Sequence, residues 1–221
     1  MTLVKNGARS TLNALNRPLG TQRLQKRLRE HGNQGCSLEI GAYETTRSGW
    51  VATDVTWRCK NYLDVTRTWP IASGSINNIF SDNVIEHLTL DSNRFFFKEA
   101  FRTLKLGGSI RLITPDIGAL VEKYRSGLSV SADLVQQLTS EGYLIAHGVD
   151  LLRFAFQDDG HDAGYLWDRD SLFTELGAVG FSELKSYDLG HSENPAFAET
   201  DSRIGAPIAE VMLAVEAKKG Q

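Results

Sequence analysis

Cysteine is scarce in this chain, with only Cys36 and Cys59 among 221 residues. Two thiols supply too few ligands for a cysteine-based metal centre and too few pairs for a disulfide framework. Two free thiols in a reducing compartment are the expectation, and a single disulfide is the alternative. The sequence therefore predicts no metal site.

Long apolar runs are absent as well. None approaches the roughly 18–20 residues that a membrane helix needs. The first twenty residues, "MTLVKNGARSTLNALNRPLG", lack the continuous apolar core that is typical of a secretory signal. These absences argue against a membrane-spanning class, and we expect a cytoplasmic protein without a membrane partner.

Acidic and basic residues are distributed unevenly. Residues 1–36 contain seven Lys and Arg but only one acidic residue, Glu30, although the whole chain has a formal net charge of −3. Leu24 and Leu28 have helical spacing among these basic residues, so we predict a basic helical arm over residues 1–35. Such an arm can contact nucleic acid, an anionic substrate, a partner's acidic face or a second copy in a homodimer, or it can be a solvated helix face.

The rest of the chain, residues 36–221, alternates strand-like and helical segments and is predicted to form one domain. Alternating strands and helices favour a mostly parallel α/β sheet with helices on both faces. The helices are predicted within 20–31, 91–107 and 168–181. Seven strands are predicted, and the last two form an antiparallel pair: 36–40, 49–55, 60–65, 77–82, 108–116, 181–190 and 208–219.

A long segment, residues 117–166, interrupts this alternation after the fifth strand. Fifty residues are too many for a plain connection between a strand and a helix in a compact α/β domain. We therefore predict a helical insert that forms a lid or wall over the substrate.

Polar residues or glycine follow four of the predicted strands. Parallel strands present their carboxyl ends at one edge of a sheet, where ligands of open α/β sheets bind. Gly41 permits a close approach of the backbone to a ligand because it has no Cβ. Asp54 can accept both hydroxyls of a ribose, and Asp64 with the backbone near Val65 can hold an adenine amino group. This pattern predicts a nucleoside site.

Four motifs extend the pattern along the chain: "LEIGA", "SDNVIEHL", "EAFRTLKLGGSIRLITPD" and "YLWDRDSLFTELGAVGF". In their order and spacing the chain resembles the class I S-adenosylmethionine-dependent methyltransferases over most of residues 36–217. It is most similar to a type 11-like subgroup often linked to polysaccharide and secondary-metabolite biosynthesis. The resemblance implies a Rossmann-like fold and S-adenosylmethionine as cofactor. It also implies methyl transfer to a small-molecule or sugar acceptor, and we expect O-methylation.

The resemblance also implies which residues contact the cofactor. They belong to the first strand and its loop, to the ends of the next two predicted strands, and to the end of the fourth: Glu39, Gly41, Ala42, Tyr43, Asp54, Val55, Asp64, Val65, Ser81 and Asn83. Glu39 can bond the cofactor's amino group directly or through water, or it can brace the loop.

The first motif departs from the usual pattern of this family. A second glycine normally follows the first after one residue, but here Ala42 and Tyr43 follow Gly41. Residues 42–49 are also too few for a crossover helix between parallel strands. Tyr43 can stack on the cofactor or close part of its pocket.

Two histidines are candidate catalytic residues. His87 ends the "NVIEH" segment beside the place where the resemblance puts the methyl donor, and His161 lies among acidic residues in "DDGHDAGYLWD". Either can deprotonate a hydroxyl acceptor. Alternatively, each orders its own loop through hydrogen bonds.

Other functions stay open at this point. A non-catalytic partner subunit with weak or no cofactor binding would explain the altered first motif. A nicotinamide-dependent oxidoreductase is disfavoured because a full G-x-G-x-x-G loop is missing. Nucleic acid is disfavoured as an acceptor because "SDNV" replaces the asparagine or aspartate, two prolines and aromatic residue of amino-group methyltransferases.

Overall fold

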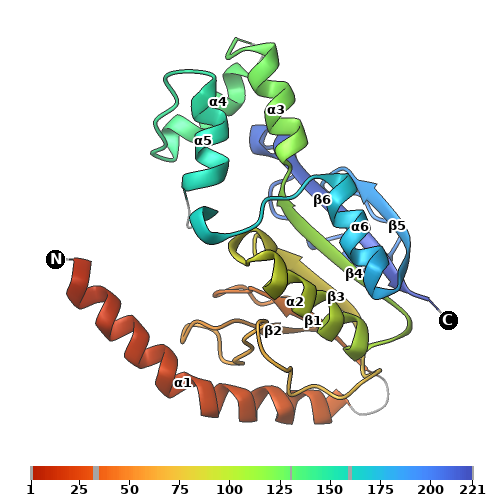
Figure 1. Cartoon of the computed structure of the whole chain (residues 1–221). Helices are drawn as coiled ribbons and strands as arrows, with labels where there is room; N and C mark the ends of the chain where they lie inside the picture. The colour runs from red at the N-terminus through yellow and green to blue at the C-terminus, as the bar shows by residue number, and fades with distance from the viewer. Residues whose placement is uncertain (1, 32–34, 130, 159–160, 221) are drawn as a thin grey trace.

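The computed structural model describes residues 2–31, 35–129, 131–158 and 161–220, and its described side chains begin at Asn16. A six-stranded sheet in the order β2-β1-β3-β4-β6-β5 forms its centre (Figure 1). Strands β2, β1, β3 and β4 run parallel to one another, and β6 runs antiparallel to both β4 and β5. The mostly parallel sheet and the antiparallel C-terminal pair are thus confirmed. The strands are β1 (Cys36–Ile40), β2 (Trp50–Thr53), β3 (Ile76–Asp82), β4 (Leu104–Pro115), β5 (Phe181–Tyr187) and β6 (Met212–Lys219).

The prediction of a seventh strand at 60–65 was wrong. This segment forms a single parallel bridge, Asp54 to Tyr62, at the end of β2. The reason lies at Asp64, whose carboxylate accepts bonds from the Thr66 amide at 3.1 Å and the Arg67 Nε at 2.9 Å. Such a side-chain-closed turn competes with extended backbone, so the chain turns away before a strand can form.

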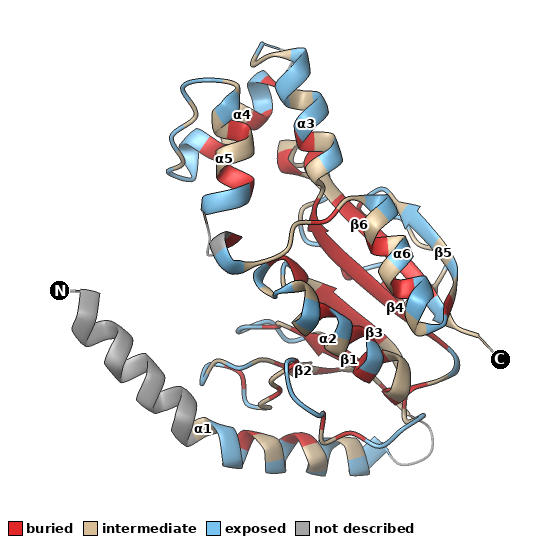
Figure 2. Ribbon diagram, viewed as in Figure 1, coloured by how far each residue is buried: buried red, intermediate tan, exposed pale blue. Residues whose placement is uncertain are grey.

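One face of the sheet packs against helices α2 (Leu90–Thr103) and α6 (Arg169–Val179). The main hydrophobic core lies between the sheet and these two helices, and Figure 2 shows the buried residues on the sheet beneath the helices. Helix α1 (Thr2–His31) runs along the β2 side of the molecule and buries Leu24 in the same core.

The ends of these helices follow local sequence signals only in part. Asp168 caps α6 by accepting a bond from the Ser171 amide at 2.8 Å, and Gly180 ends it with φ of 112°. In α2, however, the cap is Thr89, and the helix ends at Thr103 rather than near Gly107. Gly107 lies instead within β4, because the buried Leu104 already pairs with β3 there.

The second face of the sheet is covered by the connection between β5 and β6. Helical cover was predicted for both faces, but the regular structure in this connection consists of two short 3-10 helices, η4 (Pro195–Phe197) and η5 (Pro207–Val211). Phe197 packs there against Phe80 and Ile113 of the sheet. The connection between β5 and β6 therefore covers the face of the sheet beside the "LEIGA" motif, although it lies far from that motif in the sequence.

Between β4 and α6 the chain forms three helices, α3 (Ile117–Ser126), α4 (Ala132–Ser140) and α5 (Val149–Gln157). They stand together beyond the end of β4, apart from α2 and α6 (Figure 1). They share a core of their own with η5, which includes Leu120, Leu138, Leu151 and Ile208. None of the helices in the described part of the chain has both the length and the hydropathy needed to cross a bilayer.

Candidate functional site

The strand order reverses between β1 and β3, so the carboxyl ends of these strands border the crevice where such sheets bind ligands. Gly41 lies at this point with φ of 75°, and its amide donates to the Thr53 carbonyl at 3.0 Å. A Cβ at Gly41 would overlap the Val84 side chain. Only glycine fits at position 41, because the backbone φ there is positive and the loop after β3 packs too closely to leave room for a Cβ.

Tyr43 has a backbone conformation that side chains rarely adopt, with φ of 50°. Its amide donates to the Asp54 Oδ2 at 2.9 Å, and its half-exposed ring lies 5.4 Å from the Arg58 guanidinium carbon. The left-handed backbone explains why a glycine is usual at this step of the motif. The preceding residue, Ala42, is buried and donates its amide to the same Thr53 carbonyl.

Asp54 connects two loops. One carboxylate oxygen accepts from Tyr43, and the other accepts from the Thr56 amide at 2.8 Å. Val55 lies between them with an exposed side chain. The carboxylate is thus fixed at the end of β2, where it already accepts two bonds from backbone amides.

Glu39 is buried at 3% exposure beneath the first motif. Its Oε1 accepts from the Arg47 Nε at 3.1 Å, and its Oε2 has no hydrogen-bond partner among the described residues. Burial raises the pKa of this carboxyl, and the Arg47 charge opposes that effect. The neighbouring Asp82 pairs with Arg203, and burial raises its pKa against that charge.

Two further predicted residues lie at the end of β3. The Ser81 side chain is buried, and its hydroxyl oxygen has no partner within the described residues. Asn83 is exposed with φ of 51°, and its amide donates to the Ile113 carbonyl at 3.0 Å. The positive φ turns the chain sharply out of β3 toward the Val84–His87 segment.

The predicted adenine-contacting residues, Asp64 and Val65, have different surroundings. Val65 is buried in the main core, and Asp64 lines a cleft of about 480 Å³ together with Arg17 and Arg67. Tyr43 lines a different cleft, of about 820 Å³, against α1. Neither of these two clefts includes Gly41, Asn83 or His87.

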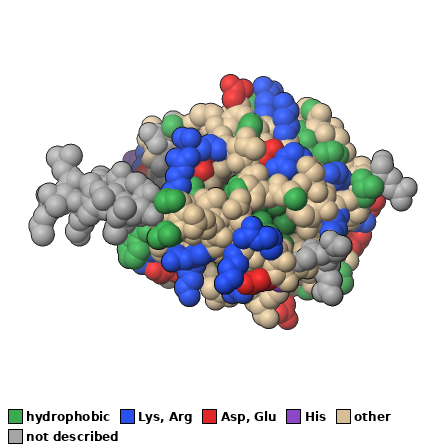
Figure 3. All heavy atoms as spheres, turned by 90° about the horizontal axis from the view of Figure 1, so that it is seen from below, with side chains coloured by type: hydrophobic (Ala, Val, Ile, Leu, Met, Phe, Trp, Pro, Cys, Tyr) green, Lys and Arg blue, Asp and Glu red, His purple; other side chains and the backbone are tan. Residues whose placement is uncertain are grey.

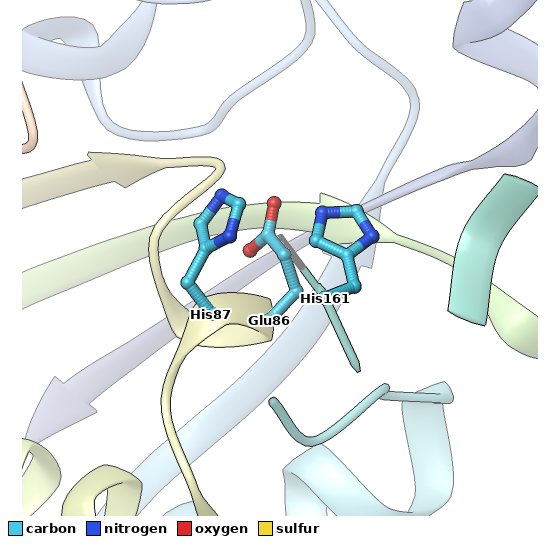
Figure 4. A group of neighbouring side chains, drawn as sticks. All are labelled: Glu86, His87 and His161. Carbon is cyan, nitrogen blue, oxygen red and sulfur yellow. The ribbon is translucent and has the colours of Figure 1, made fainter. Parts of the chain in front are cut away.

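The two predicted catalytic histidines lie together. His87 ends the 3-10 helix η2 (Ile85–His87), and His161 begins η3 (His161–Ala163) near the end of the helical insert. Their ring centroids are 4.8 Å apart, and Figure 4 shows the Glu86 carboxylate between them. One ligand-type atom from each of the three side chains lies within 4.8 Å of the others.

Glu86 was not predicted as a site residue, although it stands inside the "NVIEHL" motif. It is fully buried, its Oε2 accepts from the Thr114 hydroxyl at 3.1 Å, and its Oε1 has no partner among the described residues. Burial raises the pKa of this carboxyl to about 8. The only sequence signal was an acid beside a histidine, and its burial depends on β4 and on the distant His161 segment.

Tight backbone contacts hold this cluster in place. The Tyr165 amide donates to the Leu88 carbonyl at 2.9 Å, and a Cβ at Gly164 would overlap the Glu86 carbonyl oxygen. His161 is buried, with its Nδ1 2.9 Å from the Ala155 carbonyl. Because a carbonyl only accepts, Nδ1 carries the proton, which leaves the Nε2 lone pair of neutral His161 as the acceptor.

No family model matches this sequence, and no curated protein matches it. Among solved structures, a SAM-dependent methyltransferase from Archaeoglobus fulgidus is similar with a TM-score of 0.51 and 14% identity, over 90% of this chain and 94% of that one. The Haemonchus contortus phosphoethanolamine N-methyltransferase 2, in complex with S-adenosyl-L-methionine, gives a TM-score of 0.50 and 13% identity over 88% of this chain. The present chain spans about half of that enzyme, or 51%.

The chain has the fold of the class I S-adenosylmethionine-dependent methyltransferases. In this methyltransferase fold, the ends of β1 and β2 are joined by the bond from the Gly41 amide to the Thr53 carbonyl and by the bond from the Tyr43 amide to the Asp54 carboxylate. His87 and His161, far apart in sequence, also meet. Asp64, in contrast, lines the cleft beside Arg17.

Proposed function

We propose that this chain transfers the methyl group of S-adenosylmethionine to a hydroxyl oxygen of a small-molecule or sugar acceptor. The observation that carries this proposal is the position of the Glu86, His87 and His161 cluster. Glu86 and His87 lie in η2, shortly after β3 at the switch point of a methyltransferase-type sheet, and His161 lies beside them. Proton-accepting side chains are thereby close to the crevice in which such a fold binds its nucleoside.

In this proposal, the cofactor lies over the carboxyl ends of β1 and β2. The backbone of residues 41–43 faces it, and Asp54 accepts from its ribose while remaining bonded to the two loop amides. A carboxylate has roughly four acceptor positions, so two backbone bonds leave room for ribose hydroxyls. Glu39, whose Oε2 lacks a partner in the described structure, is the candidate for the cofactor's ammonium group.

The chemistry requires little of the protein beyond alignment, because the sulfonium is already reactive. The acceptor hydroxyl gives its proton to His87 or His161, and its oxygen lone pair forms a bond to the methyl carbon. The carbon–sulfur bond breaks and its electron pair stays on sulfur, which gives S-adenosylhomocysteine. The exposed His87 and the buried His161 together surround the position where that hydroxyl oxygen would lie.

The helical insert, residues 117–166, is proposed to hold the acceptor. Its helix α5 exposes Val149 and Phe156, with 55% and 50% of their surface accessible. The same helix ends beside His161 through the Ala155 contact. An acceptor that covers these apolar side chains would lie at the entrance to the histidine pair.

Calorimetric titration with S-adenosylmethionine and with S-adenosylhomocysteine tests the proposal, using the full chain and an Asp54→Ala variant. We expect micromolar binding that Asp54→Ala weakens at least tenfold. An Asp91→Ala variant is the matched control, because Asp91 is an exposed acid on α2, and it should bind as the unmodified chain does. Absence of heat at millimolar cofactor from a folded sample would refute the proposal.

One observation favours a second candidate, a non-catalytic partner subunit. Both Asp54 oxygens already accept backbone amides, and Tyr43 occupies the step where glycine is usual. A chain that binds neither cofactor nor product would fit this alternative. Cofactor binding followed by transfer of a labelled methyl group to a sugar or hydroxylated metabolite would exclude it.

A further inference from the structure

Glu86, His87 and His161 also form a set of metal-ligand type, which goes beyond the proton transfer proposed above. It combines one carboxylate with two imidazoles, from two segments more than seventy residues apart in the sequence. We infer that these three side chains bind a divalent transition-metal ion at the end of β3. Two imidazoles and a carboxylate suit zinc, manganese, iron or cobalt, whereas magnesium and calcium prefer oxygen ligands throughout.

The geometry of the cluster is close to what an ion needs. Bonds of roughly 2.0–2.2 Å around a tetrahedral ion place ligand atoms roughly 3.4 Å apart. The three candidate atoms already lie within 4.8 Å of one another. Side-chain rotations that move the ligand atoms by about 1 Å would close the set.

A buried oxygen without a partner points into the same place. Glu86 is fully buried, and its Oε1 accepts no hydrogen bond within the described residues, while its Oε2 is held by Thr114. Buried polar atoms are rarely left unpaired, because each loses its hydrogen bonds to water without a replacement. Figure 4 shows this carboxylate between the two rings, so an ion bound there would satisfy it.

The hydrogen bond of the His161 ring to the backbone also suits this side chain to bind an ion. Its Nδ1 donates to the Ala155 carbonyl, which is the outer contact that metal-bound histidines commonly make. That bond fixes the neutral tautomer and leaves Nε2 for the ion. Gly164 allows the His161 segment to lie directly on the Glu86 backbone, so the two segments are held together before any ion binds.

Three protein ligands leave at least one coordination position open. In the proposed reaction, the acceptor hydroxyl would occupy it. Histidines bound to the ion would not accept the hydroxyl's proton, so in this form of the reaction the ion would lower the hydroxyl's pKa, the proton would pass to solvent, and the oxygen would attack the methyl carbon. This catalytic part of the inference rests on the proposed methyl transfer, whereas metal binding itself does not.

Cobalt(II) alone is the probe, because its visible absorption reports ligand type and number. Chelator-treated full chain is titrated with Co²⁺, beside Glu86→Gln, His87→Ala and His161→Ala. The controls are His147→Ala and His191→Ala, which change exposed histidines outside the cluster. We expect one bound equivalent for the unmodified chain and both controls, and losses in affinity on the order of 100-fold or more for each cluster variant.

Several outcomes would overturn the inference. One is the absence of a cobalt band at millimolar metal, and another is equal binding by the cluster variants. Glu86→Gln and His87→Ala keep the test valid if His161→Ala does not fold, since the first is nearly isosteric and the second alters an exposed side chain.

Titrating the same samples with S-adenosylmethionine separates this inference from the proposed function. Cobalt binding without cofactor binding would refute the methyl transfer and leave the metal site standing. Full methyl transfer by the chelator-treated chain would instead refute the metal's catalytic role. A rate that falls on chelation and returns with Co²⁺, Zn²⁺ or Mn²⁺ supports both.

Discussion

A single added methyl group at Gly164 is expected to disrupt the histidine cluster. Its Cβ in a Gly164→Ala variant would overlap the Glu86 carbonyl oxygen and lie 2.8 Å from the Glu86 carbonyl carbon and 3.2 Å from the His87 Cα. All three atoms belong to the backbone, so no side chain can rotate away. The residue's φ lies outside the left-handed range, which makes space the only obstacle to alanine.

The size of the effect follows from this overlap. To relieve it, the segment around residue 164 must move by about 1 Å away from η2, at an overpacking cost of about 1–3 kcal/mol. The 2.9 Å bond from the Tyr165 amide to the Leu88 carbonyl then lengthens or breaks, at about 0.5–1.5 kcal/mol. We expect the free energy of unfolding to fall by about 1.5–4.5 kcal/mol, which is the sum of those ranges.

His161 lies three residues before Gly164 and moves with it. A misplacement of about 1 Å can cost on the order of 100-fold in rate, so methyl transfer should fall by about that factor. Cobalt affinity should fall as well, because the Nε2 of His161 leaves its position beside Glu86. Urea unfolding measures the stability, and initial rates with labelled cofactor measure the transfer.

Gly177→Ala is the matched control. Gly177 lies within α6, and a Cβ there would have no heavy atom within 4 Å. Replacing a helical glycine by alanine should stabilise the protein by about 0.5–1 kcal/mol. If Gly164→Ala is as stable as the unmodified chain and keeps its cobalt affinity, the packing of the two segments described above is wrong.

Three other predictions concern single side chains. Tyr43→Gly should be about 1 kcal/mol more stable than Tyr43→Ala, because only glycine adopts φ of 50° without strain; equal melting temperatures would contradict this. Arg111→Met should cost about 3–5 kcal/mol in urea unfolding, because it leaves the buried Asp201 and Glu216 carboxylates without their partner; a loss below about 1 kcal/mol would contradict it. Burial raises the pKa of Cys36 to about 11 from 9.0, so at pH 8 its thiolate is about 100-fold rarer in the folded than in the unfolded chain. Iodoacetamide should therefore label the Cys36 thiol at least about 100-fold more slowly in the folded than in the unfolded chain, as peptide mass spectrometry would show. Because the pKa of this thiol is higher in the folded than in the unfolded chain, the protein should also lose stability as pH rises from 9 toward 11.

The parts of the fold that sequence predicted correctly depend on neighbouring residues. Asp168, Ser171 and Gly180 define the ends of α6 within a dozen positions, so local capping signals were sufficient. The alternation of apolar strands and helices likewise indicated a parallel sheet. Where the prediction failed, at 60–65, a turn closed by the Asp64 side chain overrode two buried apolar residues, Leu63 and Val65.

The positions of the candidate site residues were likewise predictable where they depend on neighbouring residues and not where they depend on distant ones. Gly41 and Asp54 were predictable because they follow strands directly, and the structure joins their loops through the Tyr43 amide. Glu86 was missed because its burial requires Thr114 from β4 and His161 from near the end of the insert. No periodicity within "NVIEHL" shows which of its residues will lie under a segment that follows some seventy positions later.

The connection between the insert and the histidine cluster has a consequence for specificity. Helix α5 contributes Leu151 and Phe154 to the insert's own core, and the Ala155 carbonyl next to them holds the His161 ring. A change of acceptor pocket that shifts α5 therefore shifts Nε2 of His161 as well. Under the proposed function, acceptor fit and placement of the reacting oxygen are coupled through this single hydrogen bond, so substitutions in the α5 core should alter turnover more than cofactor affinity.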